Sequence, residues 1–501
     1  MQRKHLILLA IILIYLPVMV DATVLHLAIP TLSRELNFTA NEMLWVIDIY
    51  SIVMASFILP MGALGDRIGY KNQLIIGAIV FGLGSLVAGL ASTVPVLIVA
   101  RAFLGLGAAI ILPATLSGIR HTFTQEKERN FALGIWGAAG AGGGAFGPLL
   151  GGYVLEHFQW GVIFLMNVPI VLLVLGLIVY LMPKQAVRKS QALQLGQAVI
   201  LVMAILSLVF ALKSLFAGLS LSVLVSFLLG LGLLAYFIRY QSQSPNPMID
   251  LELFKQPIVS SCMVLTLFAL FAVVGFELLL AQELQFVYGY APLAAGLYIL
   301  PFMLSVSLSG PVISLLSNRF PLRALATIGL ILCGISFIVL AQTHFIEQRW
   351  QAWFCMVLLG FGIELALLSS TSALMSTVPS HKATAAGAIS GMAYELGTGL
   401  GIALFGLLLS YFYRHAIDVP PALSQALSPL LSQQATNSIA EAFTVAQGLA
   451  QPLSQELELV ASQAFTQAHS MVLWICAGLY LLLAAYIWRA LKPQAKPRAI
   501  H

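Results

Sequence analysis

The sequence predicts an all-α membrane protein that crosses the bilayer many times. Of its 501 residues, 60% are hydrophobic and only 9% are charged, whereas a soluble domain has roughly 25% charged residues. Apolar stretches of about 20 residues recur almost end to end, and each is long enough to cross the roughly 30 Å hydrocarbon core as a helix. Lys and Arg are distributed unevenly between the connecting loops, which indicates a defined membrane topology.

We expect fourteen membrane-spanning helices along the chain. The first is too long for the apolar core of a signal peptide and contains Asp21 before any small-residue cleavage site, so we expect it to be retained. The four cysteines lie within spans without paired spacing or a nearby histidine cluster, which argues against disulfides and a metal site. The expected spans cover residues 6–30, 42–62, 73–92, 94–115, 131–153, 160–182, 193–214, 218–238, 258–282, 291–316, 322–342, 350–377, 384–411 and 470–490.

The basic residues of the loops predict the orientation. With fourteen spans, nineteen Lys and Arg fall on one side and four on the other, and Arg101 within a span completes the 24. Because cytoplasmic loops carry an excess of Lys and Arg, this split places both termini in the cytoplasm. The net charge of +5 therefore reports topology, and we expect no nucleic-acid partner. The outer basic residues are Arg34, Lys213, Arg349 and Arg414.

The polar residues divide the chain into two halves joined by a plain apolar hairpin. The loops after spans two and ten have similar spacing of basic residues, which supports a degenerate repeat. In the long outer loop, helix-like spacing predicts one or two amphipathic helices over the outer face, and a mobile loop is the alternative. The expected parts are an N-terminal six-helix bundle (1–190), an inserted two-helix hairpin (191–240), a cytoplasmic linker (241–257) and a C-terminal six-helix bundle (258–501) with its outer loop (412–469).

Two opposite charges lie deep within the first half of the chain. Asp21 falls about 15 residues into the first span, roughly 22 Å from its cytoplasmic start, and Arg101 has a similar depth in the fourth span. Charges at this depth are costly, so each is a functional candidate. If they face each other, protonation of Asp21 would break the attraction and couple proton binding to helix movement. The alternative is a fixed ion pair that only secures packing.

A further carboxylate lies beside aromatic residues in the second span. Asp48 is in its outer third, close to Trp45 and Tyr50. A carboxylate next to a π face suits an organic cation, since both attract positive charge. A short carboxylate reaching the membrane interface is the alternative interpretation.

Glutamates occur in the spans of the second half. Glu364 and Glu395 fall near the middle of spans twelve and thirteen, which makes them candidates for a second proton site or for substrate binding. Glu277 and Glu283 lie near the outer end of span nine, where a charge costs less. The sequence leaves the role of this second pair open.

The fifth span contains a run of small residues with a proline. Glycines leave a bare helix face, which lets two backbones approach closely in lipid. Proline removes one backbone hydrogen bond and bends the helix. The run predicts either ordinary close packing or a helix contact that slides during function. Its key positions are Gly143, Gly147, Pro148, Gly151 and Gly152.

Signatures of enzymes and nucleotide-driven pumps are absent from the sequence. The chain contains no HExxH, no GxSxG and no Walker A motif with GK[ST]. We therefore expect no cofactor and a proton gradient as the energy source. Intramembrane carboxylates can sense such a gradient, because moving one charge across 100 mV is worth about 2.3 kcal/mol.

Taken together, these motifs resemble the major facilitator superfamily, in particular its branch of fourteen-helix drug:proton antiporters. The segment around Arg101 resembles the helix-four motif whose arginine is associated with proton transfer, and the run from Gly143 to Gly152 is similar to the helix-five motif of antiporters. The loop after span two resembles the superfamily signature that implies a cytoplasmic latch gating the conformational cycle. Its matching residues are Gly62, Asp66, Arg67, Gly69 and Lys71.

The resemblance implies a major facilitator fold that exports lipophilic organic cations in exchange for protons by alternating access. Quaternary ammonium compounds, methyl viologen, dyes and biguanide-like biocides are the implied substrates, and we expect a monomer surrounded by lipid in a bacterial inner membrane. An uptake symporter of the same fold and a sensor or scaffold without transport are the alternatives. The expected roles are proton coupling for Asp21 and its modulator Arg101, and substrate binding for Asp48, Trp45, Tyr50, Glu364 and Glu395.

Overall fold

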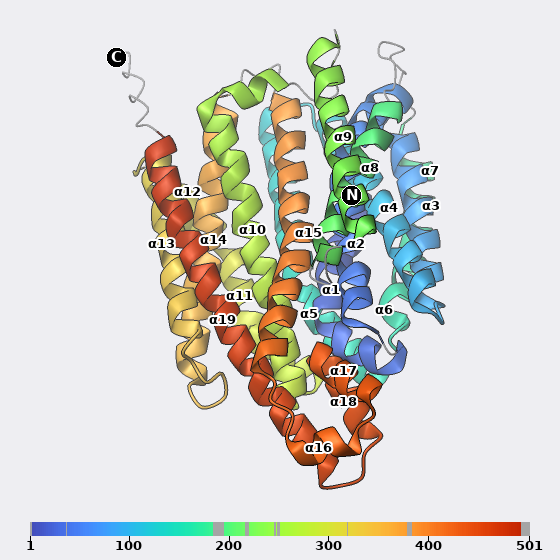
Figure 1. Ribbon diagram of the computed structural model, residues 1–501. Coiled ribbons are helices and arrows are strands. Elements are labelled where there is room, and N and C mark those ends of the chain that lie inside the picture. Colours follow the sequence, from blue (N-terminus) through green and yellow to red (C-terminus); the bar gives the residue numbers. More distant parts are fainter. Residues whose placement is uncertain are drawn as a thin grey trace.

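The computed structural model describes residues 3–36, 38–183, 195–215, 220–244, 247, 251–317, 319–377 and 383–491. Long helices run side by side through the molecule, and the short helices α16 (Pro421–Ala426), α17 (Pro429–Asn437) and α18 (Ile439–Gln447) cover one end (Figure 1). We call this end the cap end. Helix α19 (Leu453–Ala490) starts there and runs to the opposite end.

The helices of the first half form one bundle, and those of the second half form another. The first contains α1 (Arg3–Leu36), α2 (Ala40–Ile68), α3 (Tyr70–Gly89), α4 (Val94–Thr122), α5 (Glu126–His157), α6 (Val162–Leu165) and α7 (Asn167–Leu181). Between them lie α8 (Leu195–Leu215), α9 (Leu221–Gln243) and the 3-10 helix η1 (Leu251–Lys255). The second contains α10 (Pro257–Gln282), the π-helix η2 (Glu283–Val287), α11 (Pro292–Leu308), α12 (Gly310–Ser317), α13 (Leu322–Leu340), α14 (Arg349–Thr377), α15 (Ala383–Ala416) and α19.

The all-helical membrane class predicted from the sequence is confirmed. Among the described residues, 12 helices are long and apolar enough to cross a membrane, two fewer than the expected fourteen spans. Helix α5 is not among them, since it begins with charged residues and is rich in Gly and Ala. Helix α8 contributes only the shorter apolar stretch Gly196–Leu212.

The segment expected as an outer loop is largely helical. Helix α15 continues to Ala416, and α19 begins at Leu453, well before the expected span 470–490. Between them, α17 and α18 pack on each other, and α18 packs on α19. Buried apolar side chains of α18 and of the first turns of α19, including Ala442, Leu457 and Phe465, join the core of the second bundle. The cap is therefore part of the folded bundle.

The two bundles touch through a few helix pairs. Helix α5 packs against α11, α2 packs against α15, and α1 contacts α10. Helix α8 lies against α2 and α15, while α9 packs on α8. The predicted linker and several loop residues of the basic-residue count, including Lys184, Lys382 and Lys492, lie wholly or partly outside the described residues.

Candidate functional site

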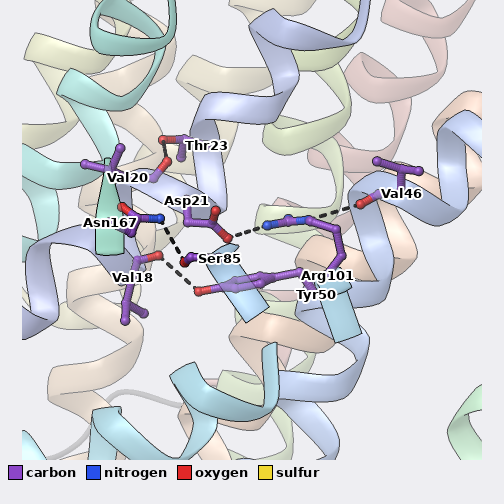
Figure 2. Close-up of polar contacts among 9 residues, drawn as sticks. All are labelled: Val18, Val20, Asp21, Thr23, Val46, Tyr50, Ser85, Arg101 and Asn167. Atoms are coloured by element: carbon purple, nitrogen blue, oxygen red, sulfur yellow. Dashed lines mark hydrogen bonds and ion pairs between the residues drawn. The ribbon is translucent and has the colours of Figure 1, made fainter. Parts of the chain in front are cut away.

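Asp21 and Arg101, predicted from their similar depths, are in contact. Arg101 Nη1 donates to Asp21 Oδ2, and each side chain is only 1% exposed (Figure 2). Arg101 Nε also donates to the carbonyl oxygen of Val46 at 3.2 Å. The pair therefore joins α1, α4 and α2 within the first bundle.

The ring of Tyr50 completes this ion-pair site. The guanidinium carbon of Arg101 lies 4.6 Å from the ring centroid, a cation–π distance. The Tyr50 hydroxyl donates to the carbonyl oxygen of Val18 at 3.0 Å, so the ring is held between α1 and α2 (Figure 2). The second carboxylate oxygen of Asp21, Oδ1, is buried and has no hydrogen-bond partner among the described residues. One acceptor of this site is thus left to receive a proton.

A cavity of about 450 Å³ lies between the two bundles. Its wall is mostly apolar, with the rings of Tyr15 and Trp136 stacked face to face at a centroid distance of 4.5 Å. Glu277, Glu364 and Glu395 also line it, and all three come from the second bundle. An apolar cavity with a few carboxylates and stacked rings is suited to a flat or bulky organic cation.

Two of the predicted substrate residues line this cavity and three do not. Glu364 and Glu395 are on its wall, whereas Trp45, Asp48 and Tyr50 are not among the lining residues. Asp48 is fully buried and lies one helical turn closer to the cap end than Ser51, which does line the cavity.

Packing between the bundles explains the position of Asp48. At this level α2 packs against α15, and a Cβ on Gly406 would lie 2.2 Å from Leu44. The cavity beside this contact has a volume of only about 20 Å³, which is too small for an organic cation. Asp48, Trp45 and Tyr50 therefore lie off the cavity wall in this conformation, and their assignment to the substrate stays a prediction.

His26 and Glu277 were not assigned to the site from the sequence. His26 Nδ1 lies 3.4 Å from Glu277 Oε2, and both residues line the cavity. His26 lies one and a half helical turns beyond Asp21 in the same predicted span. Its position could have indicated a functional residue, because a histidine within a membrane is also costly. Glu283, by contrast, forms an ion pair with His469 away from the cavity.

The small-residue run of α5 faces two neighbouring helices. A Cβ on Gly147 would lie 2.1 Å from Thr23 Oγ1 of α1, and one on Gly152 would lie 2.6 Å from the Cα atom of Leu293 of α11. Thr23 also donates to the carbonyl oxygen of Gly144 at 3.1 Å. The run therefore packs within the first bundle along most of its length and against the second bundle at its cap-end turn. Gly143 and Gly151 likewise face α1, while the carbonyl of Pro148 approaches Gly296 of α11.

The loop signature between α2 and α3 lies at the end opposite the cap. Gly69 has a φ of 80°, a conformation that favours glycine, and ends α2 while starting α3. Lys71 Nζ donates to the carbonyl oxygens of Val179 and Met182 at 2.9 and 2.6 Å, and an ammonium group at a helix C-terminus is favourable. A Cβ on Gly62 would have no atom within 4 Å, Arg67 is exposed, and the side chain of Asp66 lies outside the described residues.

Comparison with known proteins identifies the family. Residues 11–402 match the Major Facilitator Superfamily. The chain is 51% identical over 494 residues to the methyl viologen resistance protein SmvA of Salmonella typhimurium. The alignment covers 98% of this chain and 99% of that protein. It is 34% identical over 484 residues to the multidrug efflux pump LfrA of Mycolicibacterium smegmatis, with 95% of each chain covered.

A solved structure shares the fold. A bacterial homologue of the human lysosomal transporter Spinster, in an inward-facing and unoccupied conformation, superimposes with a TM-score of 0.67 at 16% identity, covering 99% of both chains. The helix arrangement, the family match and the similar efflux proteins agree with one another. The chain is therefore a membrane transporter, and it belongs to the major facilitator superfamily.

Proposed function

We propose that this protein exports lipophilic organic cations, methyl viologen and quaternary ammonium compounds among them, in exchange for protons. The observation that carries the proposal is the cavity between the bundles, whose wall contains three carboxylates and a stacked pair of aromatic rings. The 51% identity to a methyl viologen resistance protein supports the same substrate class. Carboxylates attract the charge, while rings and apolar side chains bind the body of the molecule.

Proton coupling is assigned to Asp21. Its Oδ1 atom has no hydrogen-bond partner among the described residues, and its Oδ2 atom accepts from Arg101. A proton on this carboxylate would cancel the attraction to Arg101 and release α1 from α4. A proton gradient then supplies the energy, because the charge state of the pair depends on which side of the membrane it faces.

The helices are assigned to a fourteen-span topology. Helices α5 and α8 join the 12 apolar helices as spans, α8 and α9 form an inserted hairpin, and both termini lie in the cytoplasm, as the loop charges predict. The cap end is then the outer end. Inter-bundle contacts such as that of Gly152 with Leu293 lie between the cavity and the cap, so this conformation is closed outward and takes up its cation from the cytoplasmic side as a monomer in lipid.

The decisive experiment uses everted membrane vesicles containing this protein. After a pH gradient has formed, adding ethidium or methyl viologen should dissipate it, because cation entry into the vesicle releases protons. Vesicles without the protein are the control. No response across a panel of cations would contradict export. Movement of cation and proton in the same direction would indicate an uptake symporter. Cation binding without transport would indicate a sensor.

A further inference from the structure

His26 and Glu277 form the one pair of opposite charge type on the described wall of the cavity. His26 lies on α1 of the first bundle and Glu277 on α10 of the second, with Nδ1 and Oε2 3.4 Å apart. Their side chains are 5% and 10% exposed. Neither ring nitrogen of His26 has a hydrogen-bond partner among the described residues, so the 3.4 Å contact with Glu277 is electrostatic and not a hydrogen bond. The pair therefore ties the bundles together at a position that a bound cation can reach.

The pair lies at the closed end of the cavity. The next residue after His26, Leu27, accepts a hydrogen bond through its carbonyl oxygen from Gln285 Nε2 at 3.0 Å, which also joins the two bundles. Residues of α1 that line the cavity extend from Tyr15 to His26, so His26 is its last α1 contact toward the cap. A substrate that fills the cavity to this end contacts His26 and Glu277.

Charge around the pair is strongly asymmetric. Among the described lining residues, His26 is the side chain that can become positive, and the same wall carries carboxylates from α10, α14 and α15. The Asp21–Arg101 pair is off the cavity wall, and His469 of α19 is engaged by Glu283. The ionisable residues that line the cavity are Tyr15, His26, Glu277, Glu364, Tyr394 and Glu395.

We propose that His26 is a built-in competitor for the substrate: in its charged form it occupies Glu277, and the cationic group of the substrate takes its place. This inference rests on the proposed function. It makes Glu277 the carboxylate that receives charge at the closed end, while Glu364 and Glu395 remain for a second charge. Substrate binding then also removes the tie between α1 and α10, which favours movement of one bundle against the other.

Two substitutions at one position test the competition, because they should act in opposite directions. In protein purified into lipid nanodiscs, His26→Gln removes the competing charge and should tighten ethidium and methyl viologen binding several-fold. His26→Arg fixes a charge beside Glu277 and should weaken both. Glu277→Gln should weaken methyl viologen binding about tenfold, as expected for losing a charged partner. In the double variant His26→Gln/Glu277→Gln, the gain from His26→Gln should disappear.

A matched control removes an inter-bundle contact away from the cavity. Glu156 Oε1 accepts from the Leu293 backbone at 3.0 Å and does not line the cavity, so Glu156→Ala should leave cation affinity unchanged. Equal affinities in His26→Gln, His26→Arg and wild type would overturn the competition, as would losses of the same size in both variants. Cation–proton exchange in vesicles is measured on the same wild-type protein, and its absence would refute the proposed function. If the wild-type protein exchanges but the His26 variants bind cations with wild-type affinity, only the role of His26 is refuted.

Discussion

The ion pair of Arg101 with Asp21 lies within one bundle. Both side chains are only 1% exposed, and both residues belong to helices long and apolar enough to span a membrane. It joins α4 to α1, and neither residue lines the cavity. Under the proposed function, proton binding and cation binding occur at separate positions on the same helix, since α1 also carries cavity residues such as Thr23 and His26. Coupling between them must pass through movement of α1.

Replacing Asp21 by Asn should abolish exchange while the protein still inserts in the membrane. The substitution keeps the shape of the side chain and removes its charge, which leaves the buried Arg101 unpaired. Breaking a buried ion pair in this way costs about 3–5 kcal/mol. Cation-dependent dissipation of the pH gradient in vesicles and the thermal stability of the purified protein measure the two effects.

The double variant Asp21→Asn/Arg101→Gln separates coupling from folding. It removes both charges, so part of the lost stability should return, but exchange should not. Cells that remain fully resistant to methyl viologen with Asp21→Asn would show that this carboxylate does not couple transport to protons.

A valine at Gly147 should block transport without preventing insertion. Its Cβ would lie 2.1 Å from Thr23 Oγ1 and 3.1 Å from the carbonyl oxygen of Val20, so α5 must move away from α1. Overpacking of this kind costs about 1–3 kcal/mol. Gly142 on the same helix has no atom within 4 Å of its Cβ position, and Gly142→Val is the matched control. Ethidium efflux from cells, normalised to the amount of protein in the membrane, should fall only for Gly147→Val.

Depth along a helix could be predicted from the sequence, because each residue adds a fixed rise. That sufficed to pair Asp21 with Arg101 and to place Glu364 and Glu395 near the middle of their helices. The family could also be predicted, since the loop, helix-four and helix-five motifs occur in the right order. These predictions depend on order and height alone.

Rotation and contact between helices could not be predicted in the same way. Asp48 has a plausible height, but it is buried and does not line the cavity. Glu277 looked interfacial by residue count, yet α10 continues into the π-helix η2 and keeps Glu277 inside the bundle. His26 could not be assigned from depth alone, because a histidine carries no fixed charge and its contact with Glu277 depends on how α1 and α10 are rotated.

An alanine at Gly152 should shift the protein away from the conformation described here. The added Cβ would lie 2.6 Å from the Cα atom of Leu293 and 2.8 Å from its backbone nitrogen, and backbone atoms cannot rotate aside. The cap ends of α5 and α11 must therefore separate. A cysteine introduced at Ser307 on the cavity wall should react faster with a membrane-impermeant maleimide from the cap side in Gly152→Ala than in the parent protein. Equal labelling rates would show that this contact does not hold the cap end closed.

Glu395→Gln and Asp48→Asn should differ in their effect on cation binding. Glu395 lines the cavity and Asp48 does not, so loss of the Glu395 charge removes a direct attraction to the substrate, whereas Asp48→Asn alters a buried residue beside the α2–α15 contact. We expect Glu395→Gln to weaken methyl viologen binding about tenfold, the effect of losing one charged partner. The ratio of methyl viologen to ethidium affinity should stay unchanged in Asp48→Asn. Calorimetric titration of the purified variants with both cations measures this ratio, and thermal unfolding of each variant checks that the fold is retained. A selective loss of the dication in Asp48→Asn would return this residue to the substrate site and require that the cavity extend toward the cap in another conformation of the cycle.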